Sequence, residues 1–224
     1  RIDRQSALAM QILKQSDANA VQVSRDIQQR IIGLENIYHN EDLKIIVADD
    51  STDYTLHSAN AVLIDLILAI VLVGLIMLLF LHSMRNALIV MIAIPLSLIA
   101  TFAGMYLLGF SLNLMSLVAL SLVVGILVDD AIVVIENIYR HMEMGKNVVR
   151  ASIEGTKEIG FTVISITLVI VVVFLPISLT SGMVSMILRE FTLVVVIAVL
   201  MSLLTSFTIV PMLTSRFGRL ENIE

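Results

Sequence analysis

The chain has a polar first quarter, followed by five long apolar runs. We place these runs as membrane spans at residues 61–81, 86–108, 113–136, 159–180 and 191–213. A helix needs about 20 apolar residues to cross a bilayer, and each run is long enough. Residues 86–128 contain no Asp, Glu, Lys or Arg, which is too long for one span and indicates a helical hairpin. The pattern predicts a mainly α-helical, polytopic transmembrane bundle.

Residues 1–57 have the pattern of a small polar module. Residues 6–13 and 43–48 fit strands, and residues 17–36 fit an amphipathic helix because apolar residues recur there at helical spacing. The polar residues 49–52 end the second predicted strand. We therefore expect a β-α-β piece that is too small to hold a core of its own. Its other strands are expected to come from chain upstream of this sequence.

Lys and Arg are unevenly distributed among the connections between the spans. One side holds Arg85, Arg140, Lys146, Arg150, Lys157, Arg216 and Arg219, and the other side holds only Arg189. Excess positive charge marks the cytoplasmic side, so the polar stretch 139–158 is expected there. Because five spans are an odd number, residues 1–57 then lie outside, in the periplasm of a Gram-negative cell. The expected organisation is this outer module, a five-helix bundle over residues 58–214 and a cytoplasmic tail over residues 215–224.

Composition supports lipid as the solvent for most of the chain. Of its 224 residues, 58% are hydrophobic and only 15% are charged, and the mean hydropathy is +0.98. The net charge of −5 gives no reason to expect nucleic acid as a partner. The first residue is Arg1 rather than Met, so we expect the sequence to be truncated at its start.

The third span carries two adjacent acids, Asp129 and Asp130, in the middle of an apolar run. A carboxylate in hydrocarbon is costly, so both side chains must face the bundle interior, a water path or a counter-charge. Adjacent carboxylates titrate as a coupled pair, which suits them to taking up and releasing protons. The plainer alternative is that such acids only fix helix packing through a basic partner. It is less favoured for two acids than for one.

Helical spacing extends this pair into a polar stripe. Glu136 follows Asp129 by seven residues and Asn137 follows Asp130 by seven, so each pair shares a helix face. Gly125 lies four residues before Asp129 and would let a neighbouring helix approach closely. The stripe is a candidate proton route from mid-membrane to the cytoplasmic end. For Glu136 and Asn137, an ordinary packing role at the helix end is an equal alternative.

No other group in the sequence indicates catalysis or metal binding. Asp65 is expected near the outer end of the first span, as an interfacial residue. The four histidines lack the spacing of metal ligands, so neither a metal nor a cofactor is expected. An intramembrane aspartyl protease needs two acids facing each other from separate helices. Asp129 and Asp130 lie on one helix, which argues against this activity.

The residues of the third span resemble a known family signature. The run GILVDDAIVVIEN, residues 125–137, is similar to the fourth transmembrane helix of resistance-nodulation-division (RND) efflux permeases. Residues 80–117 look like the second-to-fourth helix segment of that family, and residues 174–213 look like its fifth and sixth helices. Residues 1–57 resemble the end of a periplasmic porter subdomain.

This resemblance implies a secondary active transporter rather than an enzyme. Such permeases are homotrimers in the bacterial inner membrane, work with a periplasmic adaptor and an outer-membrane channel, and export drugs or other amphiphiles by proton antiport. Asp129 and Asp130 match the two acids that carry the proton cycle, with the proton as coupling ion and no cofactor. A second acid at Asp130 favours the multidrug branch, because heavy-metal exporters tend to have Ala there.

The chain departs from the family pattern in what it lacks. The first transmembrane helix and the second six-helix half, which holds the basic partner of the acids, are absent from this sequence. Two other functions stay open at this point. One is a five-helix, lipid-binding regulatory module similar to sterol-sensing domains, and the other is an RND protein for metal or protein export.

Overall fold

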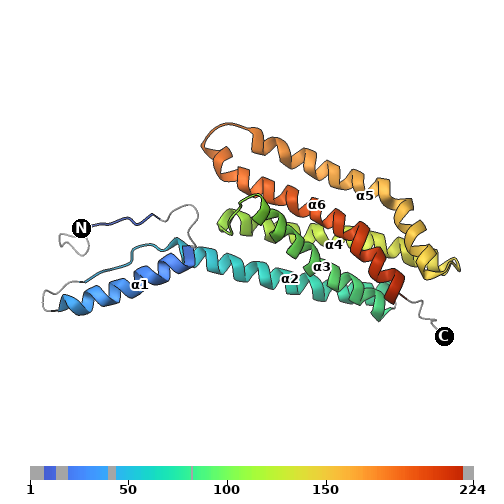
Figure 1. Ribbon diagram of the computed structural model, residues 1–224, viewed down its shortest axis with the longest axis horizontal. Helices are drawn as coiled ribbons and strands as arrows, with labels where there is room; N and C mark the ends of the chain where they lie inside the picture. The colour runs from blue at the N-terminus through green and yellow to red at the C-terminus, as the bar shows by residue number, and fades with distance from the viewer. Residues whose placement is uncertain (1–7, 14–19, 40–43, 82, 219–224) are drawn as a thin grey trace. The chain divides into compact units, whose positions relative to one another are not determined.

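The computed structural model describes residues 8–13, 20–39, 44–81 and 83–218. Its helices, labelled in Figure 1, are α1 (Ala20–Ile37), α2 (Ser51–Leu81), α3 (Met84–Leu107), α4 (Leu114–Glu143), α5 (Val148–Leu179) and α6 (Met183–Phe217). The chain divides into two compact units, Arg1–Leu56 and His57–Glu224. The second unit is a helical bundle, as the sequence predicts.

The helices α2 to α6 are each long and apolar enough to cross a membrane, which confirms the five predicted spans. They extend beyond the apolar runs, because an apolar pattern marks only the part of a helix that lies in lipid. Thus α2 begins at Ser51, and α4 and α5 together take up most of the stretch 139–158 that we expected as a polar connection. Polar caps support these extensions. The Asn147 side chain, for example, accepts a hydrogen bond of 3.0 Å from the Val149 N–H at the start of α5.

The N-terminal unit contains the expected helix but not the expected strands. The helix α1 lies over the predicted range, of which residues 17–19 fall outside the described part of the chain. Of the two predicted strands, the described residues 8–13 and 44–48 form no strand. The β-α-β prediction is wrong for these residues, because a strand exists only through ladder hydrogen bonds and neither segment finds a partner strand among the described residues.

Side chains of α1 hold the segment after it instead. The Glu35 carboxylate accepts a 3.0 Å hydrogen bond from the Ile45 N–H, and the Ser24 hydroxyl donates to Asp50. The hydrogen bond from Ser24 is the main reason why the pKa of the Asp50 carboxyl is lowered. Asp50 also accepts from the Thr52 N–H at 2.9 Å, so it caps the start of α2.

The helices α4 and α6 are the central elements of the second unit. The helix α4 packs against α3, α5 and α6, and α6 in turn contacts α3 and α5 (Figure 1). Of the most apolar stretch of α4, 56% is buried, against 11% for α5. The largest fully buried side chains of α4 are Leu120, Leu127, Ile135, Ile138 and Met142. In lipid the gain from this packing is van der Waals contact rather than removal of water.

Candidate intramembrane acid site

The two adjacent acids lie in the middle of α4 and face different sides. Successive residues of an α-helix point about 100° apart, so Asp129 and Asp130 cannot share one environment. Asp130 is buried, with 7% of its surface exposed, whereas Asp129 is exposed. The fold thus places one acid of the pair in a buried position and the other in an exposed position.

Asp130 is enclosed between α4 and α6. The Ser202 side chain of α6 interacts with the Asp130 carboxyl, and its hydroxyl donates a hydrogen bond to the Leu127 carbonyl at 3.3 Å. The Oδ2 atom of Asp130 is buried without a hydrogen-bond partner in the described part of the chain. A buried carboxylate that lacks a full set of partners is costly, and binding a proton removes its charge. Protonation would therefore lower the cost of burying this side chain.

Asp129 belongs to a strip of exposed residues along α4, which we call the open face. The open face consists of Leu122, Gly125, Asp129, Val133 and Glu136. At about 100° per residue, these five positions fall within a sector of about 80°. None of the ion pairs found among the described residues includes Asp129. The acid therefore has no counter-charge from these helices.

Gly125 was expected to allow a close helix approach beside Asp129. A Cβ atom added at Gly125 would meet nothing within 4 Å, so the space beside it is empty among the helices of this chain. Glu136 lies on the same open face as Asp129, as their spacing predicted. These three residues are therefore all exposed on one side of α4, with Val133 between Asp129 and Glu136.

Asn137 has a different surrounding from Glu136. It is buried, and its Nδ2 donates a 2.7 Å hydrogen bond to the Gly155 carbonyl of α5. A Cβ atom at Gly155 would lie only 3.0 Å from the Ile138 Cα, so the two helix backbones touch here. This hydrogen bond of Asn137 is one of helix packing, and its side chain also interacts with the Glu158 carboxylate of α5.

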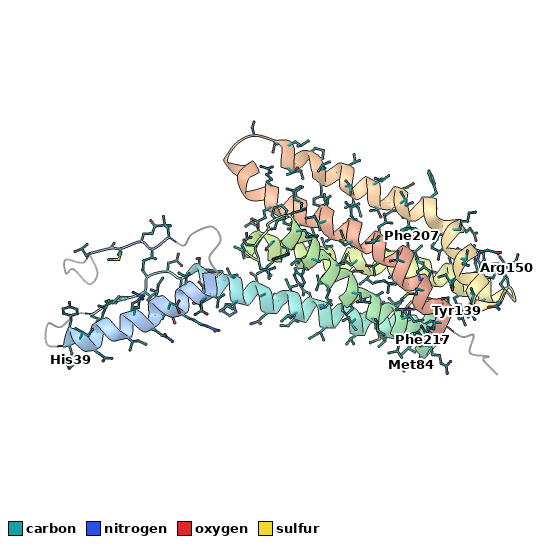
Figure 2. The ribbon with its side chains drawn as sticks, viewed as in Figure 1. His39, Met84, Tyr139, Arg150, Phe207 and Phe217 are labelled. Carbon is teal, nitrogen blue, oxygen red and sulfur yellow. The ribbon has the colours of Figure 1, made fainter. Side chains whose placement is uncertain are left out.

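The ends of α4 and α5 that meet here carry a charged cluster that the sequence reading took as part of a polar connection. Glu158 accepts from Arg140 at 2.6 Å and contacts the buried His141, and Glu154 pairs with Lys146 at 2.7 Å. Figure 2 labels Tyr139 and Arg150 at this end of the bundle. No group of three His, Asp or Glu side chains suited to a metal ion occurs among the described residues.

One polar contact inside the bundle could not be anticipated from the sequence. The Ser121 hydroxyl of α4 donates a hydrogen bond to the carboxylate of Asp65 on α2. The two residues are 56 positions apart in the chain, and no spacing rule connects them. Asp65, which we expected at the membrane interface, is thus joined to the helix that carries the acid pair.

Comparisons with known proteins match the same kind of protein over nearly the whole chain. A family model described as the AcrB/AcrD/AcrF family matches residues 1–222. Multidrug resistance protein MdtC of Citrobacter koseri is 42% identical over 207 residues, and MdtC of Escherichia coli O139:H28 is 44% identical over 208 residues. MdtC of an Enterobacter species is 45% identical over 208 residues. Each match covers 92% of this chain but 20% of the relative, so the chain spans about one fifth of the length of these proteins.

Proposed function

Because this chain belongs to the AcrB/AcrD/AcrF family, we propose that it is part of an RND multidrug efflux permease that exchanges protons for amphiphilic compounds. The protein is then a secondary active transporter of the inner membrane and not an enzyme. The proposal of proton coupling rests on the different surroundings of the two acids, Asp129 and Asp130. One acid is buried against α6 and the other lies on the open face of the same helix.

In this proposal the two acids have separate tasks. Asp129 exchanges protons with water or with a basic group contributed from outside this chain, since the described residues give it no counter-charge. Asp130 couples proton binding to a change in structure. Gain or loss of its charge alters the balance of interactions at Ser202 and hence the packing of α4 against α6.

The complete permease would place this bundle in a larger assembly. We propose that it is a homotrimer that joins a periplasmic adaptor and an outer-membrane channel, with residues 1–57 in the periplasm and the C-terminus of this chain in the cytoplasm. The distribution of Lys and Arg among the connections supports this orientation. Membrane lipids surround the exposed apolar side of α5, where little of the surface is buried.

The test is neutralisation of each acid in the complete protein. We expect Asp129→Asn and Asp130→Asn each to abolish export of a fluorescent amphiphile from cells that lack other efflux pumps, while trimers still form. Glu143→Gln is the matched control, because Glu143 is exposed at the end of the same helix. Normal export by both Asp variants would overturn the proposal.

A further inference from the structure

The helix α2 carries a third acid within an apolar span, Asp65, which the proposed function does not use. Asp65 is the only Asp, Glu, Lys or Arg among residues 58–84. It is partly buried and accepts a hydrogen bond from the Ser121 hydroxyl of α4. Ser121 itself lies within the charge-free stretch 86–128. A carboxyl inside an apolar span is therefore held by a neutral hydroxyl rather than by a cation.

The position of this contact on α4 relates it to the acid pair. Gly125 follows Ser121 by four residues, and Asp129 follows Gly125 by four. At 1.5 Å per residue, Ser121 lies about 12 Å along the helix from Asp129, and it lies about 40° around the helix from Gly125. Ser121 is thus at the edge of the open face. Beside Gly125, between the two acids, no other helix in the described part of the chain comes within 4 Å of an added Cβ.

We propose that Asp65 is a further proton-binding residue, positioned by Ser121, which exchanges protons with Asp129 through the space beside Gly125. This inference rests on the proposed function. The proton leaves the Asp65 carboxyl, passes through water in this space because the separation is too long for direct transfer, and binds the Asp129 carboxylate. Nothing is oxidised or reduced.

Few charged side chains surround Asp65. The apolar parts of α2 and α3 contain no other charged residue, and α4 contributes only the Ser121 hydroxyl and, two turns further, the acid pair. The helix α6 packs into the same hydrophobic cluster as Val62 of α2, and Arg189 and Glu190 precede this contact. Neither of these two residues forms an ion pair among the described residues.

A simple tether between α2 and α4 is the competing interpretation. A tether needs only a hydrogen-bond acceptor, and a neutral side chain such as Asn supplies one without the cost of a carboxylate in lipid. The Asp65→Asn variant separates the two interpretations, because its amide oxygen still accepts from Ser121 while the side chain no longer titrates.

The experiment measures substrate-driven proton flux by the complete permease in proteoliposomes, from mildly acidic to mildly alkaline external pH. We expect Asp65→Asn to lower the rate per folded trimer by about a hundredfold or more, the low end of what loss of a proton-transfer group costs, and to change the pH profile. Ser121→Ala should change the pH profile with a smaller loss of rate, and Ser121→Thr should restore it. Asp53→Asn, in the exposed first turn of the same helix, is the control for the substitution itself.

The Asp129→Asn variant in the same assay separates this inference from the function on which it rests. If Asp129→Asn is inactive while Asp65→Asn has the wild-type rate and pH profile, the inference about Asp65 is wrong and the proposed function stands. The inference is equally wrong if both Asp65→Asn and Ser121→Ala reduce only the amount of folded trimer. Full activity of Asp129→Asn would instead remove the role of Asp129 in the proposed function, and this inference with it.

Discussion

Alanine at Gly155 is expected to force α4 and α5 apart. The added Cβ would lie 3.0 Å from the Ile138 Cα and 3.2 Å from both the Ile138 nitrogen and the Asn137 carbonyl oxygen. All three neighbours are backbone atoms, which cannot rotate away as a side chain can. The 2.7 Å hydrogen bond from Asn137 to the Gly155 carbonyl crosses the same contact, so separating the helices would also stretch it.

The size of the effect follows from three contributions. Overpacking of a tight contact costs about 1–3 kcal/mol, and weakening a buried hydrogen bond costs about 1 kcal/mol more. Against this, replacing Gly by Ala inside a helix favours the folded state by about 1 kcal/mol. The balance predicts that Gly155→Ala lowers the free energy of unfolding by about 1–3 kcal/mol.

A second glycine of α5 provides the matched control. A Cβ at Gly160 would meet only the Phe207 ring, at 3.7 Å, which is ordinary contact. Gly160→Ala should therefore leave stability unchanged or raise it slightly. Both variants of the complete protein would be unfolded in mixed micelles of increasing SDS fraction, with loss of helix packing followed by fluorescence. Equal stability of the two variants would refute the reasoning from the close contact at Gly155.

Four further substitutions in the complete protein test other parts of the structure. Ser202→Ala removes a hydroxyl that interacts with Asp130, and we expect a changed pH profile of export with little change in the amount of trimer; an unchanged profile would contradict the role given to this hydroxyl. Asn113→Ala removes the capping box of α4 and should lower the free energy of unfolding by about 1 kcal/mol in the same assay; a stability equal to wild type would contradict this. Gly109→Ala places a side chain at a φ of 74° and should cost about 1–2 kcal/mol, which a stability equal to wild type would disprove. Arg150→Ala, by contrast, removes a largely exposed ion pair and should not measurably change stability; a clear loss would mean that the charged cluster matters more than its exposure indicates.

Much of the bundle could be predicted from the sequence, because lipid imposes a strong and local signal. A run of apolar residues of sufficient length specifies a span without reference to its neighbours, and all five spans were found in this way. The ends of the helices were less predictable. Asp50 caps α2 and Asn147 caps α5 through hydrogen bonds to nearby backbone groups, and such residues are equally common in loops.

The candidate site shows a similar limit. Asp129 and Asp130 were recognisable because acids are rare within apolar runs, but the sequence did not indicate which of them would be buried. That depends on where α6 packs, and so does the position of Ser202 beside Asp130. The prediction of strands in the N-terminal module was wrong for a related reason. A strand forms only with a partner segment, and a local sequence pattern does not show whether that partner is present.

The unequal enclosure of α4 and α5 has a consequence for how freely their sequences can vary. Val169, Val172 and Val173 of α5 are each more than 60% exposed, so any apolar side chain should serve at these positions. Val123 and Val134 of α4 are fully buried, and only side chains of similar volume should fit there. Over long divergence α5 is then free to drift while α4 is held nearly fixed. Sequence similarity among distant relatives is therefore expected to be higher in α4 than in α5.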